Sequence, residues 1–238
     1  MCGIIGYIGK KRNIQEGINM LKRLEYRGYD SSGVAWYDCQ KNKISFVKKE
    51  GKIEELEKAV LKSSFDAKSK AFILHTRWAT HGMPSDVNAH PHVDCKKEIF
   101  VVHNGIIENY LELKEKLQKE GHRFISETDT EVLAHLIEKY FTNNLEEATR
   151  LALKEVIGAY AIAVISSRDP QKIVFARQSS PLLVGLGRGE NFIASDAPAI
   201  LGHTRKVVYL DDVWPALIDV KEHRTKGKVL VLPNQNYL

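Results

Sequence analysis

The sequence predicts an α+β fold in which antiparallel β-sheets pack face to face. Three observations carry this prediction: helical periodicity is concentrated before residue 159, short apolar runs separated by turn clusters follow it, and no repeat or linker-like segment interrupts the chain. Short connections between apolar runs favour antiparallel pairing. A chain of 238 residues can bury one core, so we expect residues 1–238 to form a single domain.

Composition argues against several classes of protein. The chain carries 35 Lys and Arg against 30 Asp and Glu, and the basic residues are scattered, so we expect no nucleic-acid partner. No apolar run approaches the ~20 residues of a membrane helix, and the N-terminal charges follow the apolar stretch, the reverse of a signal peptide. Three cysteines are too few for a disulfide framework. We therefore expect a soluble, cytoplasmic protein without membrane contact.

The first third of the chain predicts both strands and helices. Glycines punctuate the apolar run 2–8, which is typical of a buried strand that other backbone approaches closely. Asn13 can cap a helix whose apolar residues recur at helical spacing as far as Gly28. The turn-like Lys41-Asn42 predicts a hairpin. The other elements expected here are strands at 33–37, 43–48 and 71–76 and a helix at 53–61.

A polar loop and several helices precede the last strands. Loop 80–97 joins two apolar runs and is rich in His, Pro, Gly and Asn, and such loops often carry sites. The segment Thr128-Asp-Thr-Glu131 predicts a capping box at the start of a helix. The other expected elements are helices at 109–120 and 130–141, a helix opened by Asn144 and Glu147, and strands at 99–102, 160–165, 172–176, 182–185, 192–194 and 207–210.

Cys2 stands directly after the initiator methionine. Trimming of Met1 leaves one residue that carries both a thiol and a free α-amine, so the nucleophile has its own base. Both groups titrate close to neutral pH, and proton transfer between them therefore costs little. The alternative is a small, unreactive residue that starts a strand.

The segment Thr76-Arg-Trp-Ala-Thr-His-Gly82 follows an apolar strand. The guanidinium of Arg77 suits a carboxylate, Trp78 could cover a small polar substrate, and Gly82 could act as a hinge. The alternatives are a surface ion pair for Arg77, a core position for Trp78, and a capping or core role for His81.

Two further features have a functional and a structural interpretation. In His103-Asn-Gly105, the Asn104 amide and the Gly105 N–H are donors that can converge on one oxygen, as in an oxyanion hole, but Asn-Gly is also a common hairpin turn. Asp129 can receive a substrate ammonium or can simply favour a helix N-terminus.

His90-Pro-His92 and Cys95 raise the question of a metal. Two alternate histidines with a thiol three residues further on lack the four-ligand spacing of a zinc site. We therefore expect no metal and no cofactor.

Six segments of the sequence are distinctive when taken together. They are Cys2-Gly-Ile-Ile-Gly, Tyr26-Arg-Gly-Tyr-Asp-Ser-Ser-Gly33, Thr76-Arg-Trp-Ala-Thr-His-Gly82, Asn88-Ala-His-Pro-His92, His103-Asn-Gly105 and Thr128-Asp-Thr-Glu131. In order and approximate spacing they resemble the glutaminase domain of the glucosamine-6-phosphate synthases, a family of class II glutamine amidotransferases among the N-terminal-nucleophile hydrolases. The resemblance covers about residues 1 to 210 and implies a four-layer αββα sandwich with two antiparallel sheets between helices.

The resemblance also implies roles for individual residues. The catalytic and substrate-binding roles are a nucleophile at Cys2, oxyanion donors at Asn104 and Gly105, a carboxylate ligand at Arg77, an ammonium ligand at Asp129, and a loop closing over glutamine at Trp78, Thr80 and His81. Arg27 and His90 take supporting positions. From Val213-Trp-Pro-Ala onward the sequence departs from the acidic, glycine-containing hairpin of the family, so the resemblance implies nothing for that tail.

The activity implied is hydrolysis of L-glutamine to L-glutamate and ammonia, with the ammonia destined for fructose 6-phosphate to make glucosamine 6-phosphate. The acceptor sugar-isomerase domains of the full-length enzyme are absent from this chain, and a homodimer is compatible with the sequence. Two rivals stay open: a silent regulatory or ammonia-gating module that retains Met1, and an N-terminal-nucleophile amidase for another small amide.

Overall fold

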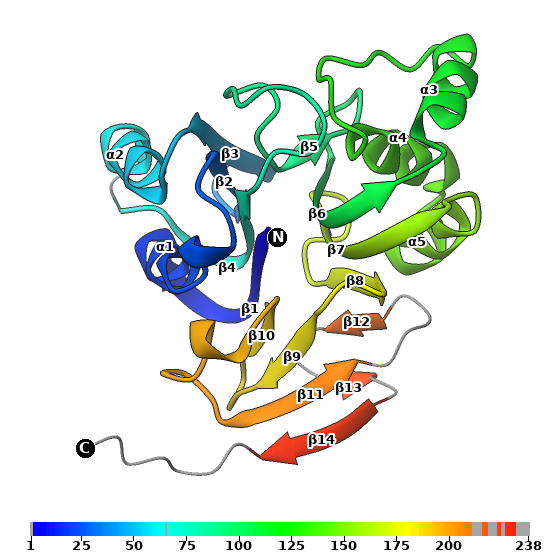
Figure 1. The fold of residues 1–238 in the computed structure, drawn as a ribbon. Helices are drawn as coiled ribbons and strands as arrows, with labels where there is room; N and C mark the ends of the chain where they lie inside the picture. Colours follow the sequence, from blue (N-terminus) through cyan, green and yellow to red (C-terminus); the bar gives the residue numbers. More distant parts are fainter. Residues whose placement is uncertain (1, 65, 211–215, 219–222, 225–226, 232–238) are drawn as a thin grey trace.

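A computed structural model describes residues 2–64, 66–210, 216–218, 223–224 and 227–231. In this part of the chain, two antiparallel sheets lie face to face and helices cover their outer faces (Figure 1). The strand orders are β14-β11-β9-β10-β1-β4-β2-β3 and β13-β12-β8-β7-β6-β5. The α+β prediction and the four-layer sandwich are confirmed. Val213, where the sequence leaves the family pattern, lies outside the described residues.

The first sheet carries helices α1 and α2, and the second carries α3, α4 and α5 (Figure 1). The helices are α1 (Ile14–Lys22), α2 (Ile53–Ser64), α3 (Tyr110–Lys119), α4 (Glu131–Tyr140) and α5 (Leu145–Leu153), with short 3-10 helices at Glu25–Arg27 and Ala197–Ala199. The strands are β1 (Gly3–Asn13), β2 (Ser31–Asp38), β3 (Lys43–Glu50), β4 (Lys68–Arg77), β5 (His92–Val93), β6 (Ile99–Ile107), β7 (Gly158–Ser166), β8 (Ile173–Gln178), β9 (Leu183–Leu186), β10 (Asn191–Ala194), β11 (Lys206–Leu210), β12 (Ala216–Ile218), β13 (His223–Arg224) and β14 (Gly227–Val231).

Three apolar layers hold the four structural layers together. Ile18 and Phe72 belong to the cluster between α1, α2 and the first sheet. Ile73 and Phe100 belong to the cluster between the two sheets, and Leu136 belongs to the cluster between the second sheet and α3, α4 and α5. Since alternate residues of a strand face opposite sides, Phe72 and Ile73 of β4 enter different clusters. Most of β4 is therefore buried on both of its faces.

The predictions of helix caps and helix ends were partly correct. The side chain of Asn13 accepts the N–H of Gln15, and Asn144 accepts the N–H groups of two residues at the start of α5, so both predicted caps are confirmed. The helix after Asn13 ends at Lys22 instead of continuing to Gly28, because the chain turns there and forms a separate 3-10 helix.

The predicted capping box at Thr128 and Glu131 is wrong. Thr130 is the N-cap residue of α4 and makes no side-chain cap bond. The Glu131 carboxylate instead accepts the N–H groups of Ile125 and Ser126, at 2.8 and 2.7 Å, and so binds the preceding loop. This loop offers the carboxylate more donors than the helix terminus does.

Among the residues that the structure describes, none of the helices combines the length and the apolar character needed to cross a bilayer.

Candidate active site

The thiol of Cys2 lies at the start of β1, a central strand of the larger sheet. Gly3 pairs with Thr76 of β4, which brings Cys2 beside the segment that follows this strand. The backbone N–H of Trp78 donates to Cys2 Sγ at 3.2 Å. Burial raises the pKa of the Cys2 thiol, although the Trp78 hydrogen bond opposes that shift. The resting thiol is therefore protonated near neutral pH and needs a base before it can attack.

Two side chains hold the backbone carbonyl of Cys2. Arg27 Nε donates to this oxygen at 3.1 Å, and Asn104 Nδ2 donates to it at 3.0 Å. Arg27 is buried and also pairs with Asp196, at 3.2 Å. The structure thus places Arg27 in contact with the residue that carries the thiol, which agrees with a supporting position.

Asn104 is fixed through all of its polar atoms. Besides the Cys2 carbonyl, its Nδ2 contacts Ser195 Oγ at 2.9 Å, while its Oδ1 accepts from His75 Nε2 at 3.0 Å. Ser195 Oγ in turn accepts the N–H of Ile4 at 2.8 Å, which ties β10 to β1. In this structure the amide faces the Cys2 carbonyl, so an oxyanion would have to compete with that oxygen for it.

Asn104 and Gly105 do not form a hairpin turn. Both lie inside β6, opposite Ala161 and Tyr160 of β7. Gly105 has φ +128°, and a Cβ there would lie 1.9 Å from the Ala159 carbonyl oxygen, so its position requires glycine. The Asn-Gly signal reflects a constrained strand and not a turn.

Arg77 is buried, which rules out the surface ion pair. Its Nη2 donates to the carbonyl of His81 and, at 3.2 Å, to that of Gly82. Its Nη1 is buried and has no hydrogen-bond partner among the described residues. Because a buried charged donor without an acceptor is costly, this nitrogen is suited to the carboxylate of a ligand.

Asp129 lies at the same end of the sheets and does not cap α4. Its Oδ2 accepts the N–H of Ile107 at 2.8 Å, and the residue is buried. Burial raises the pKa of the Cys2 thiol and lowers the pKa of the Arg77 guanidinium, and the nearby charge of Asp129 makes a smaller, upward contribution to both. The structure therefore brings a thiol, a cation and a carboxylate together, as a site for a free amino acid requires.

The loop after Arg77 lies at the surface. Trp78 is 47% exposed, so it is not a core aromatic, and its ring meets Tyr29 edge-on at 5.7 Å. The ring of His81 packs on that of Tyr110 at 5.3 Å, and Thr80 is exposed. This placement agrees with a loop that covers a small ligand.

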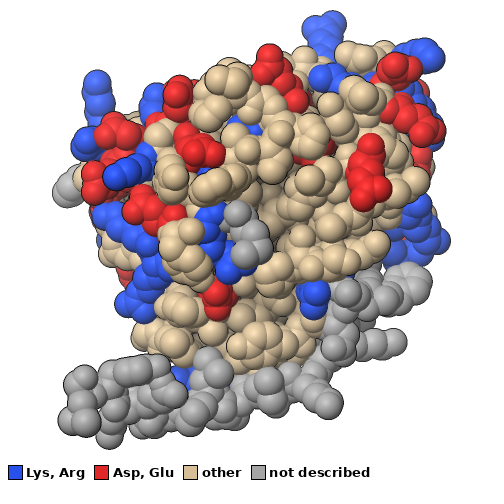
Figure 2. Space-filling view, in the orientation of Figure 1, with Lys and Arg blue, Asp and Glu red and all other residues tan. Residues whose placement is uncertain are grey.

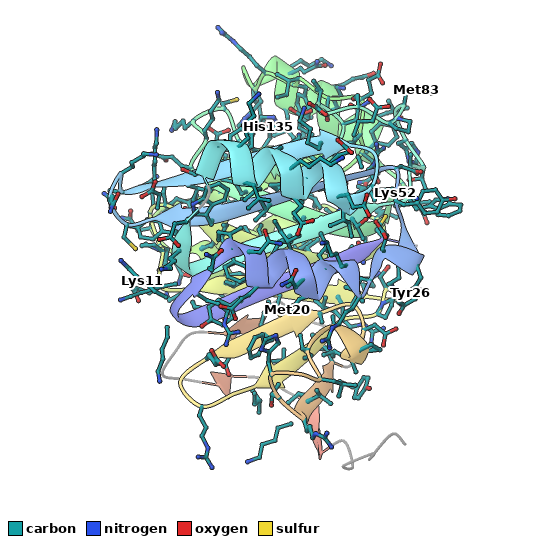
Figure 3. All side chains as sticks on the ribbon, turned by 90° about the vertical axis from the view of Figure 1, so that its left-hand side faces the viewer. Lys11, Met20, Tyr26, Lys52, Met83 and His135 are labelled. Carbon is teal, nitrogen blue, oxygen red and sulfur yellow. The ribbon has the colours of Figure 1, made fainter. Side chains whose placement is uncertain are left out.

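Figure 2 shows the face that carries the N-terminus in Figure 1. Acidic and basic side chains are interspersed there, chiefly around a broad surface of uncharged residues. Figure 3 places Tyr26 and Met83 on this same side of the molecule. Tyr26 donates to Asp196 at 2.6 Å, so it belongs to the surroundings of Arg27.

His90 and His92 do not converge with Cys95. Nε2 of His90 lies 3.1 Å from Thr130 Oγ1, and Nε2 of His92 lies 3.0 Å from Thr128 Oγ1. Both rings are buried, and burial lowers the pKa of each well below its usual value. His90 therefore supports the segment around Asp129 and does not approach the thiol directly.

Sequence reasoning missed two residues of the site. His75 orients the Asn104 side chain, and Ser195 accepts its amide. The signal available was weak: His75 is the single imidazole within an apolar run, and Ser195 directly follows the predicted strand 192–194. Neither pattern indicates a partner more than twenty residues away.

A cysteine at the start of a central strand, between two antiparallel sheets covered by helices, defines the class of the N-terminal-nucleophile hydrolases. A family model described as "Glutamine amidotransferase domain" matches residues 75–202. The chain therefore belongs to the glutamine amidotransferase domain family.

Relatives and solved structures agree with this assignment. The chain is 56% identical over 212 residues to a glutamine–fructose-6-phosphate aminotransferase [isomerizing] of Aquifex aeolicus and 53% identical over 214 residues to one of Pyrococcus horikoshii. It covers 35% of the length of each, and each match takes in 89% of this chain. A glutamine PRPP amidotransferase from B. subtilis superposes with TM-score 0.73 at 25% identity, over 93% of this chain and 50% of that one.

Proposed function

We propose that this domain hydrolyses free L-glutamine to L-glutamate and ammonia, with the thiol of Cys2 as nucleophile once Met1 has been removed. The observation that carries the proposal concerns Arg77 Nη1, which is buried and has no hydrogen-bond partner in the described part of the chain. It lies beside Trp78, whose N–H donates to the thiol. A substrate with its α-carboxylate on Arg77 and its ammonium on Asp129 can present the side-chain amide to Cys2.

Further parts of the proposal rest on the relatives. They are named glutamine–fructose-6-phosphate aminotransferases, and the chain covers about a third of their length. We propose that residues 1–238 form one glutaminase domain of such an enzyme and act in the cytoplasm. The ammonia is then used by a sugar-isomerase domain to convert fructose 6-phosphate to glucosamine 6-phosphate.

The chemistry uses the N-terminal residue twice. The α-amine of Cys2 takes the thiol proton, and the thiolate forms a bond to the amide carbon of glutamine. The oxyanion is held by Asn104 and Gly105, and the amine returns its proton to the departing ammonia. A water molecule, deprotonated by the same amine, then cleaves the thioester and releases glutamate.

The pKa of the thiol makes the free amine necessary. Burial raises the pKa of Cys2, so little thiolate forms at neutral pH without a base nearby. While Met1 is attached, its peptide bond removes the basicity of that amine. Asn104 must also release the Cys2 carbonyl or share a hydrogen with the oxyanion, and loss of one such donor typically lowers kcat about 10²- to 10³-fold.

Glutamate release from glutamine tests the proposal directly. Cys2→Ala and a form that retains Met1, verified by intact mass, are both expected to be inactive, whereas Cys39→Ser at an exposed cysteine retains activity. Normal turnover by the Met1-retaining form would contradict the self-base mechanism. Turnover of another small amide without glutamate release would instead support the rival amidase.

Substrate recognition has its own test. A charged hydrogen bond is worth ~1.5 to 3 kcal/mol, so Arg77→Ala or Asp129→Ala should lower kcat/KM for glutamine roughly ten- to two-hundredfold. Each variant should lose little on an analogue blocked at the matching carboxylate or amine, and glutamine within a peptide should be refused by the wild type. If Asp129→Ala loses activity only in proportion to its thermal stability, the assignment of Asp129 to the site is wrong.

A further inference from the structure

A second group of reactive side chains gathers away from Cys2, around α4. We name it the Cys95 cluster: Cys95, His122, His135 and Glu138. Each offers one ligand atom, and these atoms all lie within 4.8 Å of one another. Figure 3 places His135 away from the side of the molecule where Tyr26 and Met83 lie. The cluster is therefore separate from the proposed glutaminase site.

Four distances between ligand atoms of the Cys95 cluster are close to those of a tetrahedral zinc site. Bond lengths of about 2.3 Å to sulfur and about 2.0 to 2.1 Å to nitrogen or oxygen give ligand separations of about 3.6 Å for S–N and about 3.4 Å for N–O. Cys95 Sγ lies 3.6 Å from His135 Nδ1 and 3.9 Å from His122 Nδ1. Glu138 Oε2 lies 3.5 Å from His135 Nδ1 and 3.0 Å from His122 Nδ1.

Three separate segments supply these ligands. His135 and Glu138 stand three residues apart in α4 and so share one face of the helix. Cys95 follows β5, and His122 lies in the loop after α3. Backbone contacts orient the thiol segment: the N–H of Arg123 lies 3.4 Å from Cys95 Sγ, and the N–H of Cys95 donates to Glu138 Oε2 at 3.3 Å.

A second carboxylate stands behind one of the imidazoles. With Nδ1 of His135 directed into the Cys95 cluster, its buried Nε2 faces Glu131 Oε1 at 3.6 Å. A carboxylate on the far nitrogen of a metal-bound histidine fixes the tautomer and increases the basicity of the ligand. At 3.6 Å the contact of His135 with Glu131 is longer than a hydrogen bond, so Glu131 contributes negative charge beside the ring, which favours a cation nearby.

The charge of the Cys95 cluster also favours a bound cation. Within the described residues, the ion-pair partners of Glu138 are His122 and His135, which are not permanent cations. The carboxylate therefore has a thiol and two imidazoles around it and lacks a Lys or Arg. A divalent ion would balance the carboxylate together with a thiolate at Cys95.

We propose that the Cys95 cluster binds one zinc ion through Cys95 Sγ, His122 Nδ1, His135 Nδ1 and a carboxylate oxygen of Glu138. On binding, the thiol releases its proton to solvent and the imidazoles coordinate as neutral rings. All four positions are filled by protein, so the ion has a structural role. It ties the turn after β5 and the loop after α3 to α4.

Metal analysis of the untagged, full chain tests this proposal. After dialysis against zinc-containing buffer, the wild type and the matched control Cys39→Ser should each hold one tightly bound zinc. Chelator competition should show at least about 100-fold weaker binding by Cys95→Ser, because a first ligand is lost. With Co²⁺ in place of zinc, a thiolate-to-cobalt charge-transfer band should appear in the wild type, Cys39→Ser and Cys2→Ala, and be absent from Cys95→Ser.

Two results would overturn the zinc site. One is a wild type that binds no more zinc than Cys95→Ser does, and the other is a cobalt complex of the wild type without the charge-transfer band. Cys95 is exposed, so its serine variant should fold, and a thermal melt checks this. If it does not fold, His122→Gln provides the comparison of zinc affinity, while its cobalt band should remain because Cys95 is still present. Glutaminase activity plays no part in these measurements, so failure of the proposed function leaves the test intact.

Discussion

Histidines occur in two contrasting groups near the start of α4. The buried histidine group consists of His75, His90, His92 and His103. Its hydrogen-bond partners are hydroxyl groups, an amide and a backbone carbonyl, and two pairs of its rings lie 4.0 and 4.6 Å apart. The histidines of the Cys95 cluster instead face carboxylates and a thiol. The same residue type thus serves two purposes, set by its neighbours.

Burial without a carboxylate partner keeps an imidazole neutral. It lowers the pKa of His75 to about 3, and it lowers the pKa of the other three histidines of the buried group as well. A neutral ring is a directional donor, and His75 uses this to fix the Asn104 side chain. Carboxylates around an imidazole instead favour the binding of a cation, as in the Cys95 cluster. The first arrangement orients the side chain of Asn104, and the second suits a metal.

The largest expected effect is loss of stability in acid. Each histidine of the buried group binds a proton in the unfolded chain below its ordinary pKa of about 6.5 and stays neutral when folded. The unfolded state therefore binds more protons, and the free energy of unfolding falls as the pH falls. By pH 5 His75 alone should contribute about 2 kcal/mol of lost stability relative to pH 7, and the other three histidines should add to the loss in the same direction, which urea unfolding measures. A flat profile between these values would contradict the neutral state of the group.

Thr130→Val should cost about 2 to 4 kcal/mol of stability. Thr130 Oγ1 lies 3.1 Å from His90 Nε2 and 2.8 Å from His103 Nδ1, and valine has a similar shape but can make neither hydrogen bond. Chemical denaturation of the variant measures the loss, and Thr130→Ser should recover most of it because the hydroxyl returns. A valine variant as stable as the wild type would show that these two histidines do not depend on the hydroxyl.

His75→Leu should lower kcat roughly ten- to a hundredfold with little change in KM. The Asn104 Oδ1 and the His103 carbonyl each lose a donor, so the Asn104 amide is no longer held in place. Stability should fall by about 1 to 3 kcal/mol. Steady-state glutaminase kinetics separate the two effects, and an unchanged kcat in a folded variant would remove His75 from the positioning of Asn104.

Lys48→Met should raise stability by about 1 to 2 kcal/mol at pH 7. Burial lowers the pKa of Lys48 to about 8, and its Nζ donates to the Val87 carbonyl at 2.7 Å. Between pH 8 and about 10 the unfolded lysine keeps its proton while the folded one loses it, so stability rises with pH in the wild type. The rise should vanish in the variant. A destabilised variant would mean that the hydrogen bond outweighs the cost of burying the charge.

Much of the fold was predictable because strand and helix signals are local. The hairpin at Lys41-Asn42 forms between β2 and β3, with Asn42 at φ +48°, and the caps at Asn13 and Asn144 are confirmed. The capping box failed because Glu131 found donors in the loop before it. The four-residue capping-box pattern contains no information about backbone donors outside it, so it could not predict this alternative partner of Glu131.

The site was predictable only where a residue type suggests its own chemistry. Cys2, Arg77 and Asp129 carry a thiol and charges, and the structure brings them to one end of the sheets. Ser195 and His75 act by contacting Asn104, and that contact depends on the pairing of strands far apart in the sequence. The ligands of the Cys95 cluster could likewise not be predicted as a group, because only the packing of β5, α3 and α4 brings them together.

The position of β1 has a consequence for how the protein is made. It is synthesised well before β10, yet Ile5 pairs with Ala194 of that strand. At ribosomal rates of about 5 to 20 residues per second, roughly ten to forty seconds separate the appearance of these partners. During that interval the beginning of the nascent chain has no completed sheet around it and is open to a methionine-removing peptidase. Cys2 can thus gain its free amine before the proposed site around it has formed.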